Sequence, residues 1–223
     1  MASLASEISG LLYPSQCSFC DVFSGDLHFG VCEVCRTNLR LLDAPFFSLR
    51  FPRPYFDASY SACVFEREVI SAVHRLKYSS SFEVLPYCSH ILQNAFERFF
   101  QNVSLDCVIP VPVHSFRLWK RGYNQAALLA EKLAKTNAIP FERKGLKRKW
   151  VMGKSSQVGS SADDRLHQIK NNFYLSTKAD VFGKNILLID DVITTGATIN
   201  ECAKMLKKAK AEKVFVLTLA RTL

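Results

Sequence analysis

The sequence NILLIDDVITTGAT, residues 185–198, decides the fold of this chain. Its four large aliphatic residues at 186–189 are too few for a helix core and are typical of a strand buried on both faces. We predict that this strand ends at Asp190 and Asp191 and that a short loop leads into a helix over residues 199–208. A strand covered on both faces belongs in a mostly parallel sheet with flanking helices, so we predict an α/β fold.

The loop between this strand and this helix has the composition of a phosphate site. A helix N-terminus offers unpaired backbone N–H groups and the positive end of the helix dipole. Threonine hydroxyls add donors, and a glycine permits a positive φ or a close approach of the backbone to the anion. The residues predicted to bind phosphate are Thr194, Thr195, Gly196, Ala197 and Thr198.

The two carboxylates ahead of the loop indicate what kind of phosphate it binds. An acidic residue accepts hydrogen bonds from ribose hydroxyls in dinucleotide sites, and Asp190 and Asp191 suit a vicinal diol in the same way. Phosphate and diol together describe a ribose 5-phosphate. The alternative is a strand that ends in a solvated acidic turn followed by a threonine helix cap. Neither G-x-x-x-x-G-K-[ST] nor G-x-G-x-x-G occurs in the chain, which excludes the two common nucleotide loops.

The composition is that of a globular protein with a strong positive charge. The chain has 223 residues, of which 48% are hydrophobic, and a formal net charge of +9. This charge favours polyanionic partners such as nucleic acid, phosphorylated small molecules or an anionic membrane surface. The first residues lack the segments of a signal peptide, and no apolar run is long enough to cross a bilayer. We expect a cytoplasmic protein, either free or attached peripherally to the inner face of the cytoplasmic membrane.

Four cysteines near the N-terminus have the spacing of a zinc site. Cys17, Cys20, Cys32 and Cys35 form two C-x-x-C pairs. Two such pairs supply the tetrahedral four-thiolate environment of zinc and leave no coordination position open, so we expect a structural role. The other four cysteines lack ligand spacing and are interpreted as reduced core residues. We predict a zinc-binding domain over residues 1–44, a linker over 45–56 and an α/β domain over 57–223.

The rest of the chain alternates between strands and helices, which predicts parallel connections. The helix at residues 66–77 is expected to bury Val69, Ile70, Val73 and Leu76 on one face. The strand at residues 106–113 contains two prolines, which favour an edge position or a strand end. Further helices are expected at residues 85–100 and 125–135, and further strands at residues 60–65, 173–175 and 213–220.

A basic cluster follows the proline-containing strand. His114, Arg117, Lys120 and Arg121 come directly after it, and Asn124 can cap the next helix. The cluster is therefore expected at the carboxyl end of a strand, where a second anionic group of the same ligand can be held. The alternative is a solvated basic turn, because lysine and arginine are mostly exposed whatever their role.

A segment upstream of the phosphate loop has the composition of a lid. Residues 141–150 are strongly basic, and residues 153–161 are rich in glycine and serine. This composition favours mobility, as a segment that closes over a ligand requires. A surface loop without function is the alternative.

The motif at residues 185–198 resembles the phosphoribosyl pyrophosphate (PRPP) motif of type I phosphoribosyltransferases. With the cysteine pairs, PVPVH at residues 110–114 and RGYNQA at residues 121–126, nearly the whole chain resembles the ComF family of bacterial competence proteins. The sequence departs from the family pattern at Ser115, where proline is frequent, and at Lys210, where glycine commonly ends the last helix. Also similar are Leu76, Lys77 and Tyr78 at a helix end and the spaced Gln157, Arg165, Asn171 and Phe173.

The resemblance implies a phosphoribosyltransferase type I fold and a site for PRPP with Mg²⁺. It assigns Asp190 and Asp191 to the ribose and Mg²⁺, and residues 194–198 to the 5-phosphate. It assigns no catalytic residue. The pyrophosphate is assigned to Val113, His114, Arg117, Lys120 and Arg121, and a lid to Lys147, Gln157 and Arg165.

The same resemblance implies that the protein handles single-stranded DNA taken up during natural transformation. Basic residues interleaved with aromatic ones suit such a ligand, although each tryptophan capping the core is the alternative. A second hypothesis is an active Mg²⁺-dependent phosphoribosyltransferase acting on a nucleobase or an amine. A third is an interaction module whose zinc region docks a competence helicase or an inner-membrane DNA translocation protein. The residues expected at single-stranded DNA are Arg117, Trp119, Lys120, Arg121, Lys147, Arg148, Lys149 and Trp150.

Overall fold

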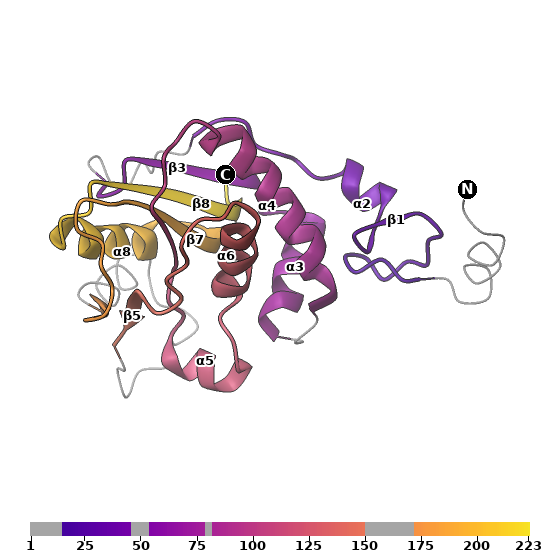
Figure 1. The fold of residues 1–223 in the computed structure, drawn as a ribbon. Coiled ribbons are helices and arrows are strands. Elements are labelled where there is room, and N and C mark those ends of the chain that lie inside the picture. Colours follow the sequence, from indigo (N-terminus) through magenta and orange to yellow (C-terminus); the bar gives the residue numbers. More distant parts are fainter. Residues whose placement is uncertain (1–14, 46–53, 79–81, 150–171) are drawn as a thin grey trace.

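Strand β7 (Asn185–Ile193) is an inner strand of a four-stranded sheet. Its neighbours are β8 (Lys213–Arg221) and β4 (Cys107–Pro110), and β3 (Ala58–Val64) pairs with the far side of β8. The computed structural model describes residues 15–45, 54–78, 82–149 and 172–223 (Figure 1). All three strand pairs of this sheet are parallel, which confirms the expected α/β class.

Strand β7 extends further than the sequence indicates. Beside β8 the pairing continues to Ile193↔Arg221, whereas beside β4 it stops at Pro110↔Ile189. The expectation that the strand ends at the acidic pair is therefore wrong on the β8 side, because the long β8 keeps residues 190–193 extended. Asp190 and Asp191 still lie beyond the last β4 pair, so they border an open side of the sheet at its carboxyl end.

Helices cover both faces of the sheet. Leu187 and Ile189 pack into a core with three helices, and Ile186 and Leu188 pack into a second core on the other face. This alternation follows from the period of two along a strand. The helices of the first core are α3 (Arg67–Tyr78), α4 (Leu85–Phe100) and α6 (Gln125–Thr136). The second core contains α8 (Ala197–Lys208) and the antiparallel hairpin of β5 (Leu146–Arg148) and β6 (Phe173–Leu175).

The edge position expected for the proline-containing strand is confirmed, whereas the buried face expected for α3 is wrong at one residue. Strand β4 lies at an edge of the sheet, as its prolines indicate. In α3 the buried residues include Ala72 in place of Ile70, whose side chain is exposed. Ile70 lies about 100° around the helix from Val69, at the border of the apolar stripe, and the small Ala72 lies nearer the middle.

The N-terminal cysteine region packs against helices α3 and α4 of the α/β domain. It contains β1 (Leu27–His28), β2 (Val31–Cys32) and α2 (Glu33–Thr37), and Figure 1 shows α3 and α4 between this region and the sheet. The Phe19 ring meets the Tyr87 ring of α4 edge to face at 5.5 Å, and Asp21 forms an ion pair with Arg75 of α3. Cys17, Phe19 and Val31 belong to the same buried cluster as α3 and α4.

The chain that follows α2 is tied to the sheet on both sides of the undescribed residues 46–53. Val64 N–H donates to Arg40 O at 2.9 Å, and Leu42 N–H donates to Ala62 O at 3.0 Å. These bonds form a short antiparallel contact along the outer edge of β3. Phe56, at the end of the expected linker, is buried in the second core. The linker is therefore anchored at both ends to the α/β domain.

Candidate functional site

The acidic pair and the basic cluster meet at the carboxyl end of the sheet. Because β4 and β7 are parallel, residues 111–114 and residues 190–198 leave the sheet at the same edge. Val111 N–H donates to Ile189 O at 2.8 Å, so the two segments begin side by side. Ligands of open α/β sheets bind at this edge, where consecutive loops diverge. Val113 lies half-buried in the loop after β4.

Asp191 is a buried carboxylate with a lysine partner. Its side chain is 6% exposed, and its Oδ2 lies 2.7 Å from Nζ of Lys77, in the last turn of α3. Gln125 Nε2, at the start of α6, donates to the same oxygen at 3.3 Å, and Val192 N–H donates to Oδ1 at 2.9 Å. Two helices distant in sequence and the backbone of β7 itself therefore hold this carboxylate in place.

Asp190 is a half-buried carboxyl whose charged form is destabilised. Its Oδ1 accepts a hydrogen bond from Asp191 N–H at 2.9 Å. Burial, the neighbouring charge of Asp191 and a hydrogen bond between the two side chains raise the pKa of Asp190 well above its ordinary value. Lys77 opposes this shift only weakly. The pair therefore has too little positive charge around it to be stable as two carboxylates, which is the condition in which a cation binds.

The expected phosphate loop has the backbone of an anion site. Gly196 has φ +76°, in the left-handed region, and is the N-cap of α8, so the helix begins at Ala197. The positive φ predicted as one use of this glycine is confirmed. Thr195 Oγ1 accepts from Ala197 N–H at 3.4 Å, and the side chain of Thr194 is exposed. Thr198 lies in the first turn, where backbone N–H groups point out of the helix.

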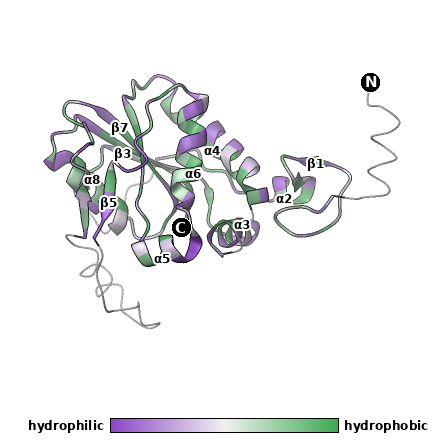
Figure 2. Ribbon diagram, turned by 60° about the horizontal axis from the view of Figure 1, so that its bottom comes forward, coloured by the Kyte–Doolittle hydropathy of each residue, from purple (hydrophilic) through white to green (hydrophobic). Residues whose placement is uncertain are grey.

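The basic cluster forms a helix, α5 (Ser115–Arg121), in place of the turn considered from the sequence. His114 caps it, with Nδ1 accepting from Phe116 N–H at 3.2 Å, and Gly122 ends it at φ +80°. No residue of α5 is buried, so the helix projects from the domain as a strip of mixed hydrophobic and hydrophilic residues (Figure 2). Arg117 and Lys120 are exposed.

Arg121 has a different environment from the rest of α5. Its Nη1 donates to Gln125 Oε1 at 3.2 Å, and its guanidinium lies 4.8 Å from the centre of the Tyr78 ring. Gln125 in turn donates to Asp191, so Arg121 is linked to the acidic pair through one residue. The end of α3 and the start of α6 thereby fix the position of the last α5 residue.

Arg148 faces the site from the opposite side. The two-residue period of β5 places Arg148 on the side of the buried Leu146, while Lys147 points outward and is exposed. Arg148 lies 5.3 Å from the centre of the Phe173 ring. Burial, followed by the charges of Arg148 and Arg117, lowers the pKa of His114, so these three groups lie within electrostatic reach of one another. Burial and Arg117 also lower the pKa of Arg148.

Several expected site residues lie outside the described part of the chain. These are Trp150, Gln157 and Arg165, together with the glycine- and serine-rich segment. Lys149 is described and exposed. Sequence reasoning missed Lys77 and Gln125 as partners of Asp191. Both occur in sequence blocks shared with the ComF pattern, at residues 76–78 and 121–126, and only this signal pointed to them.

The four N-terminal cysteines converge as their spacing predicts. Their Sγ atoms all lie within 4.8 Å of one another, and Cys20 Sγ is 3.8 Å from Cys32 Sγ. Zinc–sulfur bonds of about 2.3 Å in a tetrahedron place neighbouring sulfurs about 3.8 Å apart, so the four thiols fit zinc. Burial raises the pKa of Cys17, but N–H donors of Cys32, Phe19 and Cys20 outweigh burial and lower it to about 7.

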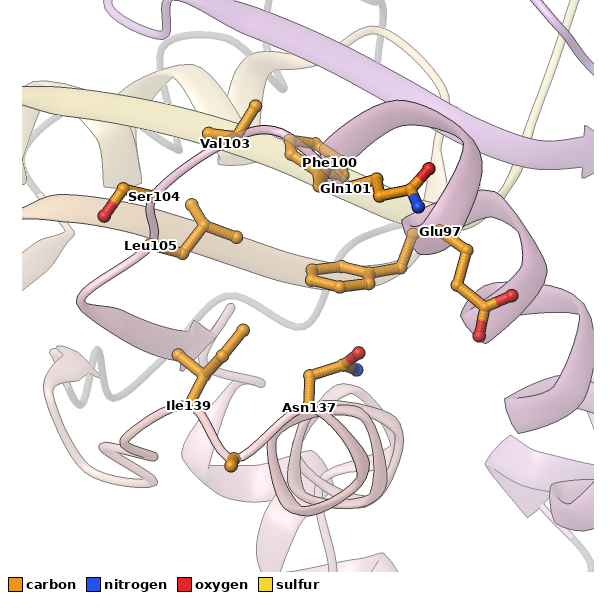
Figure 3. A pocket seen from close by; sticks show the side chains of 10 residues that line it. Glu97, Phe100, Gln101, Val103, Ser104, Leu105, Asn137 and Ile139 are labelled. Carbon is orange, nitrogen blue, oxygen red and sulfur yellow. The ribbon is translucent and has the colours of Figure 1, made fainter.

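A hollow elsewhere on the surface does not belong to this site. It has a volume of about 660 Å³ and lies between the end of α4, the chain before β4 and the end of α6 (Figure 3). Phe100, Leu105 and Ile139 form its apolar part, and Glu97 and Asn137 lie at its rim. The chain enters β4 here, so the hollow lies at the amino end of that strand, away from the acidic pair. Among the described helices, none has the length and apolar composition needed to cross a membrane.

Comparisons with known proteins agree with this arrangement. The phosphoribosyl transferase domain family matches residues 88–222. Competence protein F of Haemophilus influenzae is 38% identical over 67% of this chain and 66% of its own length. DNA utilization protein YhgH of Salmonella typhimurium is 29% identical over 96% of this chain and 100% of its own length. Competence protein ComFC of Bacillus subtilis is 30% identical over 86% of this chain and 71% of its own length. The chain therefore belongs to the phosphoribosyl transferase domain family and, within it, to the ComF family of competence proteins.

Proposed function

We propose that the carboxyl edge of the sheet binds PRPP. The observation that carries this proposal is the meeting of an acidic pair, a left-handed Gly196 at a helix start and a basic helix at one edge. In this assignment the N–H groups of residues 194–198 bind the 5-phosphate. Asp190 and Asp191 accept the ribose hydroxyls, Arg117 and Arg148 neutralise the pyrophosphate, and His114 donates a hydrogen bond to it.

Mg²⁺ fits the same site. Carboxylate oxygens are its usual protein ligands, and Asp190 and Asp191 stand next to each other without sufficient positive charge. Asp190 and Asp191 would hold the cation, which would supply positive charge to offset that of the leaving group. Gln125 contacts Asp191 and would keep this carboxylate oriented toward the ligand.

We further propose that α5 binds single-stranded DNA. Trp119 is 78% exposed and Phe116 is 56% exposed, and their rings lie 6.2 Å apart. Such exposure is unfavourable for aromatic side chains in water but suits stacking with unpaired bases. Arg117 and Lys120 on the same helix supply contacts to phosphates. The alternative that Trp119 caps the core does not fit its exposure.

The names of the relatives support a cellular process in which this DNA binding would act. Competence proteins and a DNA utilization protein are among the relatives of this chain. We infer that this protein handles incoming single-stranded DNA on the cytoplasmic side of the membrane during natural transformation. PRPP would then act as a second ligand whose site adjoins the DNA-binding helix.

Two binding measurements test these assignments. Calorimetry with Mg²⁺ and PRPP should give a saturable signal that is lost in Asp190→Asn/Asp191→Asn. Fluorescence anisotropy with a labelled oligothymidylate should show binding that the same double variant retains at low salt, because two fewer carboxylates near a phosphate strand cannot weaken it electrostatically. Loss of both ligands in a folded double variant would mean that DNA and PRPP share the pocket. Absence of PRPP binding to the unmodified protein would refute the first assignment.

Phosphoribosyl transfer is the alternative function, supported by the domain family itself. Pyrophosphate release from PRPP, measured with a panel of nucleobases and amines, decides between the two. Turnover with one acceptor at ordinary enzyme rates, about 1–1,000 per second, would establish transfer. Binding without turnover would assign PRPP the role of a ligand that is not consumed.

The cysteine region offers a surface for a protein partner. Val22, Phe23 and Val34 are each at least 59% exposed, although a region of this size has little apolar area to spare. We propose that this surface contacts a competence helicase or an inner-membrane DNA translocation protein. Replacing the three residues by Ser should lower transformation frequency and leave zinc content, PRPP binding and DNA binding unchanged. Unchanged transformation would remove the proposal.

A further inference from the structure

The ammonium group of Lys77 has a fixed position next to Asp191, one of the two residues of the acidic pair. Its Nζ lies 2.7 Å from Asp191 Oδ2, and its side chain is 25% exposed against 6% for the carboxylate. The helix end that carries it is fastened: Tyr123 Oη donates to Leu76 O at 2.8 Å, and Leu76 itself is buried. Tyr78, the next residue, lies under the guanidinium of Arg121. Lys77 is therefore held at the carboxylate by residues on both sides of it.

The position of Lys77 changes what the acidic pair can bind. Two adjacent carboxylates would attract any divalent cation, and free Mg²⁺ is abundant in a cell. An ammonium at hydrogen-bond distance from one carboxylate already supplies part of the charge that such a cation would supply. Asp191 already has three donors, since Gln125 and the Val192 N–H group contact it together with Lys77. A bare cation must compete with all three donors and gains only one free carboxyl.

A cation that arrives on a polyphosphate meets a different balance. The ligand carries negative oxygens of its own, and these can accept a hydrogen bond from the lysine ammonium when Asp191 turns to the ribose or the cation. No charge is then left without a partner. Lys77 thus lowers the affinity of the site for the bare cation but not for the complex. The discrimination comes from an interaction that is unfavourable to the wrong ligand.

We propose that Lys77 is a specificity-determining residue. It prevents the acidic pair from binding a bare divalent cation, so that the pair binds such a cation only in complex with a diphosphate-bearing ribose ligand. The proposal rests on the assignment of this pair to PRPP and Mg²⁺ made above. It concerns which form of the cation binds.

The test uses Mn²⁺ alone as the probe and Lys77→Met as the variant. Binding is followed by the loss of the paramagnetic resonance signal of free Mn²⁺, in the absence of any phosphate. We expect Lys77→Met to bind Mn²⁺ about tenfold more tightly than the unmodified protein or better, because Asp191 loses its counter-ion. Adding Asp191→Asn to Lys77→Met should cancel the gain.

The matched control is Lys207, in the last turn of α8. Lys207 Nζ lies 2.8 Å from Asp57 Oδ2, and the lysine side chain is 28% exposed, so the pair resembles Lys77–Asp191 in geometry and in the burial of its lysine. Lys207→Met should leave Mn²⁺ affinity at the unmodified value. Lys77→Gln, which keeps a polar group at the helix end, provides a second variant should Lys77→Met fold poorly, and it should show the same gain.

The outcomes separate this inference from the proposed function. Mn²⁺ affinity of folded Lys77→Met and Lys77→Gln within about threefold of the unmodified protein, under conditions in which calorimetry shows Mg²⁺–PRPP binding, would overturn the role of Lys77 and leave the PRPP assignment standing. Failure of the unmodified protein to bind Mg²⁺–PRPP would instead reject the proposed function. A gain confined to the two Lys77 variants and cancelled by Asp191→Asn would support the inference.

Discussion

At the scale of single residues, the acidic pair is an unfavourable arrangement of charge. Asp190 is placed beside a second carboxylate, and burial together with that neighbour raises its pKa. Asp191, in contrast, has side-chain partners, because Lys77 and Gln125 contact it. An arrangement that destabilises the protein and has no structural benefit of its own is typical of a binding site.

Replacing Asp190 by Asn should stabilise the ligand-free protein at neutral pH by about 0.5–2 kcal/mol. The raised pKa means that the folded state holds the proton more tightly than the unfolded state, whose value is near 3.8. The destabilisation is therefore absent below about pH 4, grows as the pH rises toward the folded pKa and is complete above it. Thermal unfolding of both proteins at pH 4 and pH 7 measures the difference.

The matched control for this change is Asp180→Asn. Asp180 is an exposed aspartate whose pKa is lowered by its hydrogen bond and ion pair with Lys184. Its replacement should give no stabilisation at pH 7, since a lowered pKa contributes stability at neutral pH that is lost on acidification. A melting temperature for Asp190→Asn at pH 7 that does not exceed that of the unmodified protein would contradict the assigned environment.

At the scale of elements, the end of α8 shows how a sequence departure is tolerated. Lys210 N–H donates to Lys207 O at 3.0 Å and Ala211 N–H donates to Leu206 O at 3.1 Å, the two bonds of a Schellman motif. This motif needs a left-handed residue, and Lys210 supplies it at φ +60°. The expectation that a lysine at this position replaces the left-handed cap by another one is therefore wrong, because Lys210 itself adopts the left-handed conformation.

Lys210→Gly should stabilise the protein by about 0.5–1 kcal/mol. A left-handed conformation costs a residue with a Cβ about 1–2 kcal/mol, and part of the gain is offset by the greater freedom of glycine in the unfolded chain. Urea unfolding measures the change. Lys208→Gly, two residues earlier and still within the helix, should destabilise by about 0.5–1 kcal/mol. The same sign for both substitutions would show that the left-handed cap is not what matters.

Helix α5 is stabilised by its caps and not by buried side chains. With no buried residue it contributes little to the core, so its exposed aromatic side chains can be changed at low cost to folding. This makes α5 the best place to separate stacking from charge in the proposed DNA contact.

Trp119→Ala should weaken oligothymidylate binding by about 1–3 kcal/mol and leave its salt dependence unchanged. Arg117→Ala/Lys120→Ala should instead reduce the slope of log affinity against log salt by about 1.4, because each phosphate that is no longer neutralised accounts for about 0.7. Anisotropy titrations at several salt concentrations measure both. Phe182→Ala is the control, because Phe182 is 70% exposed but precedes β7 at the amino end of the sheet. Equal reductions in affinity for Phe182→Ala and Trp119→Ala would argue against a site on α5.

At the scale of the whole molecule, the cysteine region and the α/β domain share buried residues. Their buried residues belong to one cluster, which runs from Cys17 and Phe19 through α3 and α4 to the sheet (Figure 1). Metal binding at the four cysteines therefore stabilises more than the short segment that contains them.

Cys17→Ser/Cys20→Ser should lose zinc and lower the free energy of unfolding of the whole protein by several kcal/mol, out of the about 5–15 kcal/mol typical of proteins. The loss should appear as one earlier transition when helix content and tyrosine environment are both followed. Restoring zinc to chelator-treated unmodified protein should restore the original transition, and the double variant should not respond. A domain over residues 57–223 that melts at an unchanged temperature would contradict the shared core.

The sequence by itself determined the features that depend on neighbours in the chain. Ile186 to Ile189 specify a doubly buried strand, Gly196 specifies the start of α8, and the cysteine spacing specifies a metal site, because each follows from local geometry. The same reasoning placed the end of β7 wrongly, since that end depends on the length of β8. It also predicted no helix at residues 115–121, where the caps His114 and Gly122 decide the structure.

Only the tertiary structure decided which residues surround the ligand site. Lys77 and Asp191 are 114 positions apart in the sequence, and no local pattern shows that a lysine on the polar side of α3 meets a buried carboxylate. The sequence assigns Arg148 to DNA and Lys147 to both DNA and the lid, yet the pleat of β5 turns Arg148 toward His114. These contacts arise because parallel strands bring the ends of separate loops to one edge, and the charge balance at that edge is a property of the folded chain.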